Sequence, residues 1–272
     1  MLKWRKYNGA LIPEHPPHIE VSIDATEVLR NINKEEAFFA RWTTNFDCRE
    51  ETEFWYVICD EVLDIASYSK NTRNQIRRGL KKCEVRMIDK CEVKEFGFEC
   101  YKAAFLRYNT HLVPNTLPQF KDELDSLDST WEFWGIYNEG KMIGYCQNKV
   151  INDYCDYSTI KFHPEYLKLY PSYALFYTMN QYYLKEKNFK YVNDGARSIS
   201  HETNIQSFLI QKFKFRKAYC KLNIVYNKPV GFLVTVIYPF RLILKSLNFW
   251  LFIKLNILIN QEKIRRSYAK RR

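Results

Sequence analysis

The sequence CDYSTIKFHPEYLKLYPSYALF, residues 155–176, opens the part of the chain with the clearest structural signal, which continues to Tyr226. Strand and helix patterns alternate there, in the order strand, helix, strand, helix, strand. The first strand is predicted over 154–162, because β-forming residues dominate it, and it ends before Pro164. Alternation of this kind is typical of an α/β fold.

A helix is predicted after this strand, with Ser172 as its N-terminal cap. Its apolar residues fall at helical spacing: Leu175, Phe176, Met179 and Tyr183. Asn188 and Phe189 are expected to end the helix as a left-handed cap followed by a hydrophobic residue.

A short strand over 190–192 and the polar turn 193–197 come next. A second helix is predicted to open at Thr203, where Gln206 completes a capping box, and 216–226 returns as a strand. Both helices would then point their N-terminal amides at one edge of the sheet. Such amides favour an anionic ligand or an oxyanion.

The rest of the chain shows further strands and helices without internal repeats. We expect strands at 38–46, 54–59, 83–88, 131–137 and 141–151, and helices at 72–82, 94–109 and 119–127. The triplet Asn138-Glu139-Gly140 predicts a hairpin turn between two of these strands. Residues 1–20 hold three prolines and a glycine, from which we predict irregular structure.

The positive charge is concentrated near the C-terminus. Of the formal net charge of +11, residues 228–272 contribute +9, from ten basic residues and one glutamate. The rest of the chain is nearly neutral, so its charge does not call for a polyanionic partner. Eight cysteines occur without a Cys-x-x-Cys pair, which gives no metal-ligand spacing and favours reduced thiols in a cytoplasmic protein. No apolar run follows Met1 to Lys6, so we expect no signal peptide.

The segment 229–272 is apolar but interrupted by charges, and its uncharged runs are too short for a spanning helix. From Phe240 on, the polar residues of one helical sector are Arg241, Lys245, Asn248 and Asn256. The apolar residues that lie away from it are Leu244, Leu247, Trp250, Leu251, Leu255 and Leu258. An amphipathic helix with a polybasic end predicts peripheral binding to an anionic inner-membrane surface. The alternative is a helix pair packed on the body, followed by a solvated basic tail.

Two segments resemble the GNAT acyltransferase superfamily. TNIQSFL (203–209) with KFKFRK (212–217) is similar to the last part of that superfamily's domain, and SKNTRNQIRRGL (69–80) with EVR (84–86) is similar to a passage of its FemAB-related branch. With the order of elements, the resemblance covers about residues 40–226.

The resemblance implies an α/β (α+β) fold, with a GNAT-like mixed sheet flanked by helices. It implies a degenerate N-terminal half at 1–90 and an acyltransferase domain at 91–227, followed by the amphipathic helix and polybasic tail at 228–272. It also implies an activated acyl donor, such as acyl-CoA, and no metal. Members that use coenzyme A carry a Gly-rich loop whose amides hold the pyrophosphate, whereas the equivalent turn here, KLYPSYA (168–174), has no glycine. That departure leaves acyl carrier protein and aminoacyl-tRNA open as donors.

The densest polar cluster outside the termini is the loop 194–204. It offers His201 or Glu202 as a base, since acyl transfer to an amine or hydroxyl needs a proton acceptor. The candidate donor- or substrate-binding residues of this loop are Asp194, Arg197 and Asn204. The alternative is a solvated loop in which Thr203 and Asn204 cap a helix and Asp194 and Arg197 form a structural ion pair.

Polar residues on the strand 154–162 form a second set of candidates. Alternation predicts that Asp156 and Ser158, the catalytic candidates, share one face, while Lys161, a candidate ligand of the substrate, shares the other with Tyr157. The alternative is that they are ordinary polar residues of a strand.

Two further pairs are candidates for donor binding. Ser172 and Tyr173 lie at a predicted helix start, and the arginines Arg73 and Arg77 suit a phosphate of a carrier, a tRNA or a lipid headgroup. The alternatives are a plain helix cap and a solvated basic helix face.

Together these features predict an acyltransferase that moves an acyl or aminoacyl group from an activated donor to an amine or hydroxyl acceptor. Cell-envelope glycan or lipid biosynthesis at the cytoplasmic membrane face is the setting that the resemblance and the tail imply. Two other classes stay open: a non-catalytic GNAT-fold adaptor at the membrane, and a tRNA- or RNA-binding module.

Overall fold

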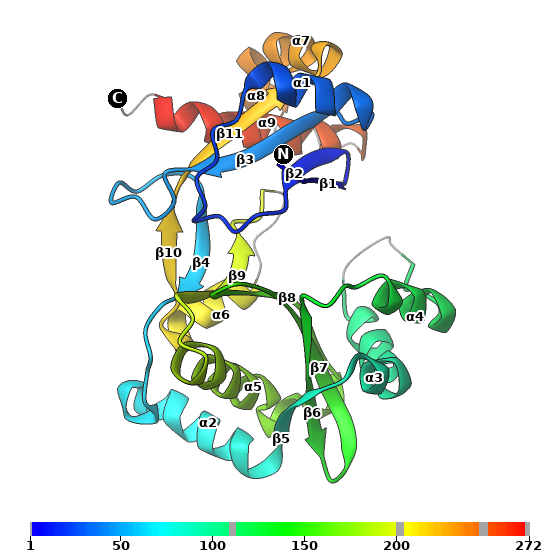
Figure 1. Cartoon of the computed structure of the whole chain (residues 1–272), viewed down its shortest axis with the longest axis vertical. Coiled ribbons are helices and arrows are strands. Elements are labelled where there is room, and N and C mark those ends of the chain that lie inside the picture. The colour runs from blue at the N-terminus through cyan, green and yellow to red at the C-terminus, as the bar shows by residue number, and fades with distance from the viewer. Residues whose placement is uncertain (1, 109–112, 200–203, 245–249, 270–272) are drawn as a thin grey trace. The chain divides into compact units, whose positions relative to one another are not determined.

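The computed structural model is a mixed α/β structure with two sheets flanked by helices (Figure 1), which confirms the predicted fold class. It describes residues 2–108, 113–199, 204–244 and 250–269, and only the backbone of 243–244, 250–254 and 269. Contacts divide the chain into two compact units: unit 1 is Met1–Tyr56, Ala196–Asn204 and Lys217–Arg272, and unit 2 is Val57–Gly195 and Ile205–Arg216. The predicted division into domains at 1–90, 91–227 and 228–272 stays a prediction.

Unit 1 is built on a four-stranded sheet of order β1-β2-β3-β11. Its strands are β1 (Trp4–Tyr7), β2 (Ala10–Pro13), β3 (Phe39–Thr44) and β11 (Lys221–Tyr226). Helix α1 (Ala25–Lys34) buries Ile32 with Ala40 on one face of the sheet. Helix α9 (Trp250–Ala269) buries Ile264 with Leu222 on the other face. Alternation along β3 and β11 therefore supplies a core on each side.

The N-terminal hairpin corrects the prediction that residues 1–20 are irregular. β1 and β2 pair in antiparallel register from Trp4↔Pro13 to Tyr7↔Ala10. Asn8 and Gly9 form the turn with φ of 49° and 77°, which is the Asn-Gly pattern of tight hairpins. Pro13 stands at the end of its strand, where the missing N–H costs little.

Unit 2 contains most of a seven-stranded sheet of order β10-β4-β9-β8-β7-β6-β5. The chain passes between the units within β4, β9 and β10 and again between residues 204 and 205. The strands are β4 (Trp55–Cys59), β5 (Glu84–Ile88), β6 (Trp131–Asn138), β7 (Lys141–Ile151), β8 (Tyr154–Phe162), β9 (Tyr191–Ala196) and β10 (Arg216–Tyr219). β5 to β8 are antiparallel neighbours, whereas β8 and β9 are parallel.

Helices cover both faces of this sheet. α3 (Lys90–Phe105) and α4 (Leu117–Asp125) bury apolar residues against Tyr145 of β7. On the face that carries Tyr157 lies α5 (Pro171–Asn180), which continues as a π-helix over Gln181–Glu186. α2 (Lys70–Lys82) packs on α5, and α6 (Asn204–Phe213) places Phe213 5.6 Å from Phe176 of α5 between ring centroids.

Several local predictions are confirmed. The helix predicted over 72–82 is present as α2, which begins two residues earlier, at Lys70, after its N-cap Ser69. Glu139 and Gly140, both at positive φ, turn the chain between β6 and β7. The αL cap of the helix that ends near residue 187 is also present, with Asn188 at φ 54° and the Phe189 amide donating to the Tyr183 carbonyl. Each of these signals is local in sequence, which explains why they could be predicted.

The single strand predicted over 216–226 is wrong. The chain forms two strands there, β10 and β11, which belong to different sheets. The break falls at Cys220, whose amide donates to the carbonyl of Phe54. Both halves carry the same β-forming pattern, so the change of sheet leaves no mark on periodicity.

The C-terminal segment forms α7 (Lys228–Ile237), α8 (Arg241–Leu244) and α9, and residues 245–249 between the last two lie outside the described residues. The second half of α9 is packed, since Ile259 and Ile264 are buried together with the polar Gln261 and Glu262. For that half, the alternative of a helix packed on the body is confirmed. None of the helices that the structure describes is long and apolar enough to span a bilayer.

Candidate functional site

Strands β8 and β9 separate in the middle of the sheet. They pair at three positions and stop at Asp156↔Asn193, although β8 continues to Phe162 and β9 to Ala196. Beyond Asp156, no described strand pairs with the β8 edge that faces β9. The backbone N–H and C=O groups of that edge are therefore available to a ligand, as they are at any unpaired edge.

On its other edge, β8 carries a β-bulge at Ser158. Asn148 of β7 pairs with Tyr157 and Gln147 pairs with Thr159, so that Ser158 is one residue too many. Ser158 is exposed. Because a bulge bends its strand and redirects the side chains that follow, it accounts for the departure of β8 from β9.

The bulge reverses the alternation that the sequence predicted for Lys161. Lys161 pairs with Tyr145 and Asp156 pairs with Lys149, so both side chains lie on the face of β7 that carries its odd-numbered residues. Tyr157 lies on the opposite face. The prediction that Lys161 shares a face with Tyr157 is wrong, because the extra residue shifts the parity of everything after it. Lys161 donates from Nζ to the Tyr108 hydroxyl at 2.9 Å.

Asp156 is held at the point of separation by a buried amide. Asn193 Nδ2 donates to Asp156 Oδ1 at 3.0 Å and to the Tyr154 hydroxyl at 3.1 Å. The Asn193 side chain is 1% exposed, and its Oδ1 has no hydrogen-bond partner among the described residues. Buried polar atoms are usually paired, so an orphaned oxygen beside a carboxylate marks a place where a water or ligand group fits.

Asp194, the next residue of β9, is a carboxyl group with an unusual proton affinity. Burial raises its pKa from 3.8 to about 8, and the negative charge of Asp156 adds to the effect. A carboxyl group with a pKa near neutrality exchanges protons at working pH, which is why such groups cluster at catalytic sites. Asp156 and Asp194 therefore form a coupled acidic pair where the strands part.

The start of α5 differs from the prediction that Ser172 caps it. The N-cap is Tyr170, in the left-handed conformation at φ 62°, and Ser172 is the second helical residue, without a capping hydrogen bond. A 3₁₀ turn over Pro164–Leu169 leads directly into the helix, which therefore begins earlier than the serine suggests. The Tyr170 carbonyl accepts the amides of Tyr173 and Ala174.

Tyr173, the other candidate at this turn, has its ring in the core. Its centroid lies 5.1 Å from that of Phe208 and 5.8 Å from that of Phe213, and burial raises the pKa of its hydroxyl. The ring is a packing group, and a donor-binding role for Tyr173 stays a prediction.

The basic helix α2 lies against the same turn. Gly79 permits the approach, since a Cβ atom there would stand 2.6 Å from the Tyr170 carbonyl oxygen. Arg78 places its guanidinium 4.9 Å from the Tyr170 ring centroid. Arg73 donates to the Ala66 carbonyl at 3.0 Å, and Arg77 is exposed. Of the two predicted phosphate ligands, Arg77 is the more accessible.

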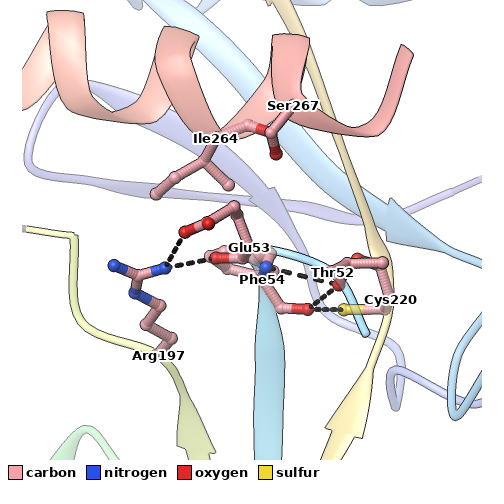
Figure 2. Close-up of polar contacts among 7 residues, drawn as sticks. All are labelled: Thr52, Glu53, Phe54, Arg197, Cys220, Ile264 and Ser267. Carbon is pink, nitrogen blue, oxygen red and sulfur yellow. Dashed lines mark hydrogen bonds and ion pairs between the residues drawn. The ribbon is translucent and has the colours of Figure 1, made fainter. Parts of the chain in front are cut away.

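Arg197 belongs to unit 1, where it pairs with Glu53. Figure 2 shows its guanidinium directed at Glu53, with an ion pair of 3.0 Å to Oε2. The same group lies 4.6 Å from the Trp55 ring centroid. The alternative of a structural ion pair for Arg197 is right in kind, but its partner is Glu53 rather than Asp194. Asn204 is exposed as the first residue of α6, and His201, Glu202 and Thr203 lie outside the described residues.

Asp156 and the bulged Ser158 thus lie on β8 and Asp194 lies on the neighbouring strand β9, while Arg73 and Arg77 lie on α2. Asn193 and Tyr154 were not among the predicted site residues, whereas Arg78 belongs to the basic helix face that includes Arg73 and Arg77. Asn193 had a weak signal, since it is an amide that directly follows a short apolar strand.

A surface hollow of about 380 Å³ lies elsewhere in unit 2, at the far side of the sheet between β5 and β6. Its lining includes Asp89, Trp131 and Glu132, and none of the predicted site residues. The candidate site between β8 and β9 is therefore identified from the strand pairing, and the hollow is a separate feature of unit 2.

The comparisons with known proteins agree with this architecture. No family model matches the chain, and no curated protein matches it in sequence. Among solved structures it is similar to FemX, at 13% identity and a TM-score of 0.53 over 77% of this chain and 71% of that one. It is also similar to a C-terminal domain assigned to a lysylphosphatidylglycerol synthetase of Agrobacterium fabrum, at 12% identity and a TM-score of 0.55 over 86% and 83%. L-PGS from Bacillus licheniformis gives 12% identity and a TM-score of 0.50 over 85% and 83%.

These similarities are structural and lie far below the identity at which function transfers. They show that the chain shares the fold of FemX and of these two lysylphosphatidylglycerol synthetase structures, which agrees with the fold that the sequence resemblance predicted.

Proposed function

We propose that the chain is an acyltransferase that moves an acyl or aminoacyl group directly from an activated donor to an amine or hydroxyl acceptor. The observation that carries the proposal is the separation of β8 and β9 at Asp156↔Asn193, beside the bulge at Ser158. It places an unpaired strand edge next to a coupled pair of carboxyl groups. The edge supplies N–H donors, and the pair supplies a proton acceptor.

In the proposed reaction, the acceptor nitrogen or oxygen attacks the donor carbonyl carbon. A C–N or C–O bond forms, the bond from carbon to the donor's sulfur or oxygen breaks, and the leaving group takes up a proton. Amides of the open β8 edge stabilise the negative charge on the carbonyl oxygen in the transition state. Asp156 accepts the acceptor's proton, and Asp194 keeps a proton at neutral pH because of its raised pKa. His201 and Glu202 remain proposed as alternative bases.

The donor is proposed to bind at the first turn of α5, through Ser172 and the arginines of α2. Acyl-CoA, acyl carrier protein and aminoacyl-tRNA all carry phosphate that suits this place. Two of the similar structures are named for lysylphosphatidylglycerol synthesis, which supports an aminoacyl donor and a lipid or lipid-linked acceptor. We place the reaction at the cytoplasmic face of the membrane, in cell-envelope glycan or lipid synthesis.

Mass spectrometry of small molecules and carriers that co-purify with the full chain tests the donor class. With the donor in hand, Asp156→Asn is expected to lower kcat by about 100-fold or more, as removal of a general base does. Asp153→Asn is the matched control, since Asp153 lies on the turn before β8 and pairs with Lys190 at 2.9 Å. Equal activity of Asp156→Asn and the control, together with full activity of a His201→Ala and Glu202→Ala double variant, would refute the mechanism.

A non-catalytic adaptor is the second candidate, and one observation favours it. The turn that precedes α5 has Tyr170 and Pro171 where a phosphate-binding loop would have glycine. An adaptor predicts that Asp156→Asn, at normal protein level, fully complements a strain that lacks the protein. An RNA-binding module predicts instead that Arg73→Glu with Arg77→Glu abolishes retention of nucleic acid.

A further inference from the structure

Unit 1 presents large apolar side chains to solvent on α7 and the turn that follows it. The exposed residues are Phe232, Leu233, Val236, Phe240 and Leu242. Phe232 and Leu242 are 74% and 75% exposed. Phe232 and Val236 are one turn apart on α7, Phe240 ends the 3₁₀ turn Tyr238–Phe240, and Leu242 lies on α8; we call these five exposed residues the α7–α8 stripe. Soluble surfaces rarely gather apolar side chains in this way without a function.

The stripe lies on the face of α7 that is not used for packing inside unit 1. α7 (orange in Figure 1) contacts β11 and α9 within unit 1, and it buries Val234 there. The inner face of α7 is therefore already used. The stripe points away from that contact, because Phe232 and Val236 flank Val234 by two positions on a helix.

Basic side chains lie directly beside the stripe. Tyr238 has the guanidinium of Arg241 4.8 Å and that of Arg266 4.1 Å from its ring centroid. Arg266 also forms an ion pair with Glu262 at 2.6 Å, and Arg265 binds the same carboxylate, so the two arginines share one negative charge. The segment 228–272 as a whole carries a formal charge of +9.

We infer that the α7–α8 stripe inserts into the interfacial layer of an anionic lipid bilayer, with Arg241 and Arg266 at the headgroup phosphates. Exposed apolar side chains, an aromatic ring at their edge and adjacent arginines are the features of an interfacial binding helix. The charge of the segment complements anionic lipid rather than an apolar protein groove. This inference names the surface for the proposed membrane location, and it does not depend on acyl transfer.

Sedimentation of the full chain with lipid vesicles tests the inference. One set of vesicles is phosphatidylcholine alone, and the other contains equal parts of phosphatidylcholine and phosphatidylglycerol. We expect retention on the mixed vesicles, weaker retention on phosphatidylcholine, and a loss of about tenfold or more for Phe232→Glu with Leu242→Glu. Arg241→Ala is expected to weaken binding to mixed vesicles by roughly fivefold and to leave binding to phosphatidylcholine unchanged.

The matched control is Leu106→Glu, because Leu106 is 72% exposed in unit 2 and lies outside the stripe. Its retention should equal that of the wild type. Since Phe232, Leu242 and Leu106 are exposed, thermal unfolding of their variants should match the wild type. Failure of the wild type to bind either vesicle, or unchanged binding of the Phe232→Glu and Leu242→Glu variant, would overturn the inference. A dimer in solution that this variant dissociates, without vesicle binding, would instead assign the stripe to a second copy of the chain.

Discussion

Replacement of Asp194 by asparagine is expected to stabilise the protein, and the gain should grow with pH. Asp194 has its pKa raised from 3.8 to about 8, first by burial and then by the charge of Asp156. The folded state therefore binds a proton that the unfolded state releases between about pH 4 and pH 8. Unfolding releases that proton, so the free energy of unfolding of the wild type falls as pH rises through this window.

The magnitude follows from the size of the shift. Each pKa unit corresponds to about 1.4 kcal/mol. At about pH 7, some three units above 3.8, the raised pKa of Asp194 therefore lowers the free energy of unfolding by at most ~4 kcal/mol. Asp194 is only partly shielded from solvent, so we expect about half of this, ~2 kcal/mol. At about pH 5 the same reasoning gives less than ~1 kcal/mol, and below pH 3.8 the cost is absent.

Urea unfolding followed by far-ultraviolet circular dichroism, at about pH 5 and about pH 7.5, measures the difference between the wild type and Asp194→Asn. Asp156→Asn should flatten the pH dependence in part, since it removes the second cause of the raised pKa. Asp128→Asn is the control: hydrogen bonds from Thr130 lower its pKa below 3.8, so its pH dependence lies at more acidic pH, and its difference from the wild type should not change between these two conditions. A difference between wild type and Asp194→Asn that stays constant with pH would refute the assignment.

Three further predictions concern packing and hydrogen bonds. Gly79→Ala should destabilise the protein by ~1–2 kcal/mol, because the new Cβ atom would stand 2.6 Å from the Tyr170 carbonyl oxygen. Gly231→Ala should stabilise it by ~0.5–1 kcal/mol, because the nearest atom is 3.5 Å away and alanine favours the helix. Thermal unfolding of the two variants measures both effects. Tyr157→Phe should cost ~1–2 kcal/mol in urea unfolding, since it removes the donor to the buried Asn180 Oδ1 at 2.8 Å, and an unchanged midpoint would contradict this. Glu53→Gln should lower the melting temperature slightly, because it removes the ion pair with Arg197, and it should leave acyl transfer intact. A large loss of kcat would instead indicate that Arg197 takes part in the reaction.

The sequence predicted those elements whose signals are short in range. The basic segment 72–82 was enough to predict α2, and Asn138-Glu139-Gly140 was enough to predict the β6–β7 turn. The N-terminal hairpin was not predicted, although Asn8-Gly9 is a standard turn pair, because three prolines within residues 1–20 favour irregular structure. The Ser172 cap was wrong because a 3₁₀ turn that runs into a helix through a left-handed tyrosine has no serine-like signature.

The candidate site could be predicted only in part, for a reason that concerns pairing. Asp156 and Asp194 were named from the sequence, but their coupling depends on β8 and β9 lying side by side. The hydrogen bond from Asn193 to Asp156 depends on the same pairing of strands. The bulge at Ser158 depends on β7, since an extra residue exists only relative to a partner strand. A period-2 pattern read along one strand therefore could not place Lys161 on the correct face.

The packing of α2 on α5 bears on the choice of donor. A phosphate held by bare amides needs an open first helical turn, but here Pro171 has no N–H, and the amides of Tyr173 and Ala174 are bonded to the Tyr170 carbonyl. Gly79 brings α2 against that carbonyl, and Arg78 lies over the Tyr170 ring. The glycine that permits close approach is thus on the neighbouring helix, where it serves contact between helices instead of contact with a ligand. Phosphate at this turn would meet guanidinium groups more than backbone amides, and this favours a donor recognised by side-chain charge, such as an aminoacyl-tRNA or a carrier protein, over a nucleotide cradled by a glycine loop.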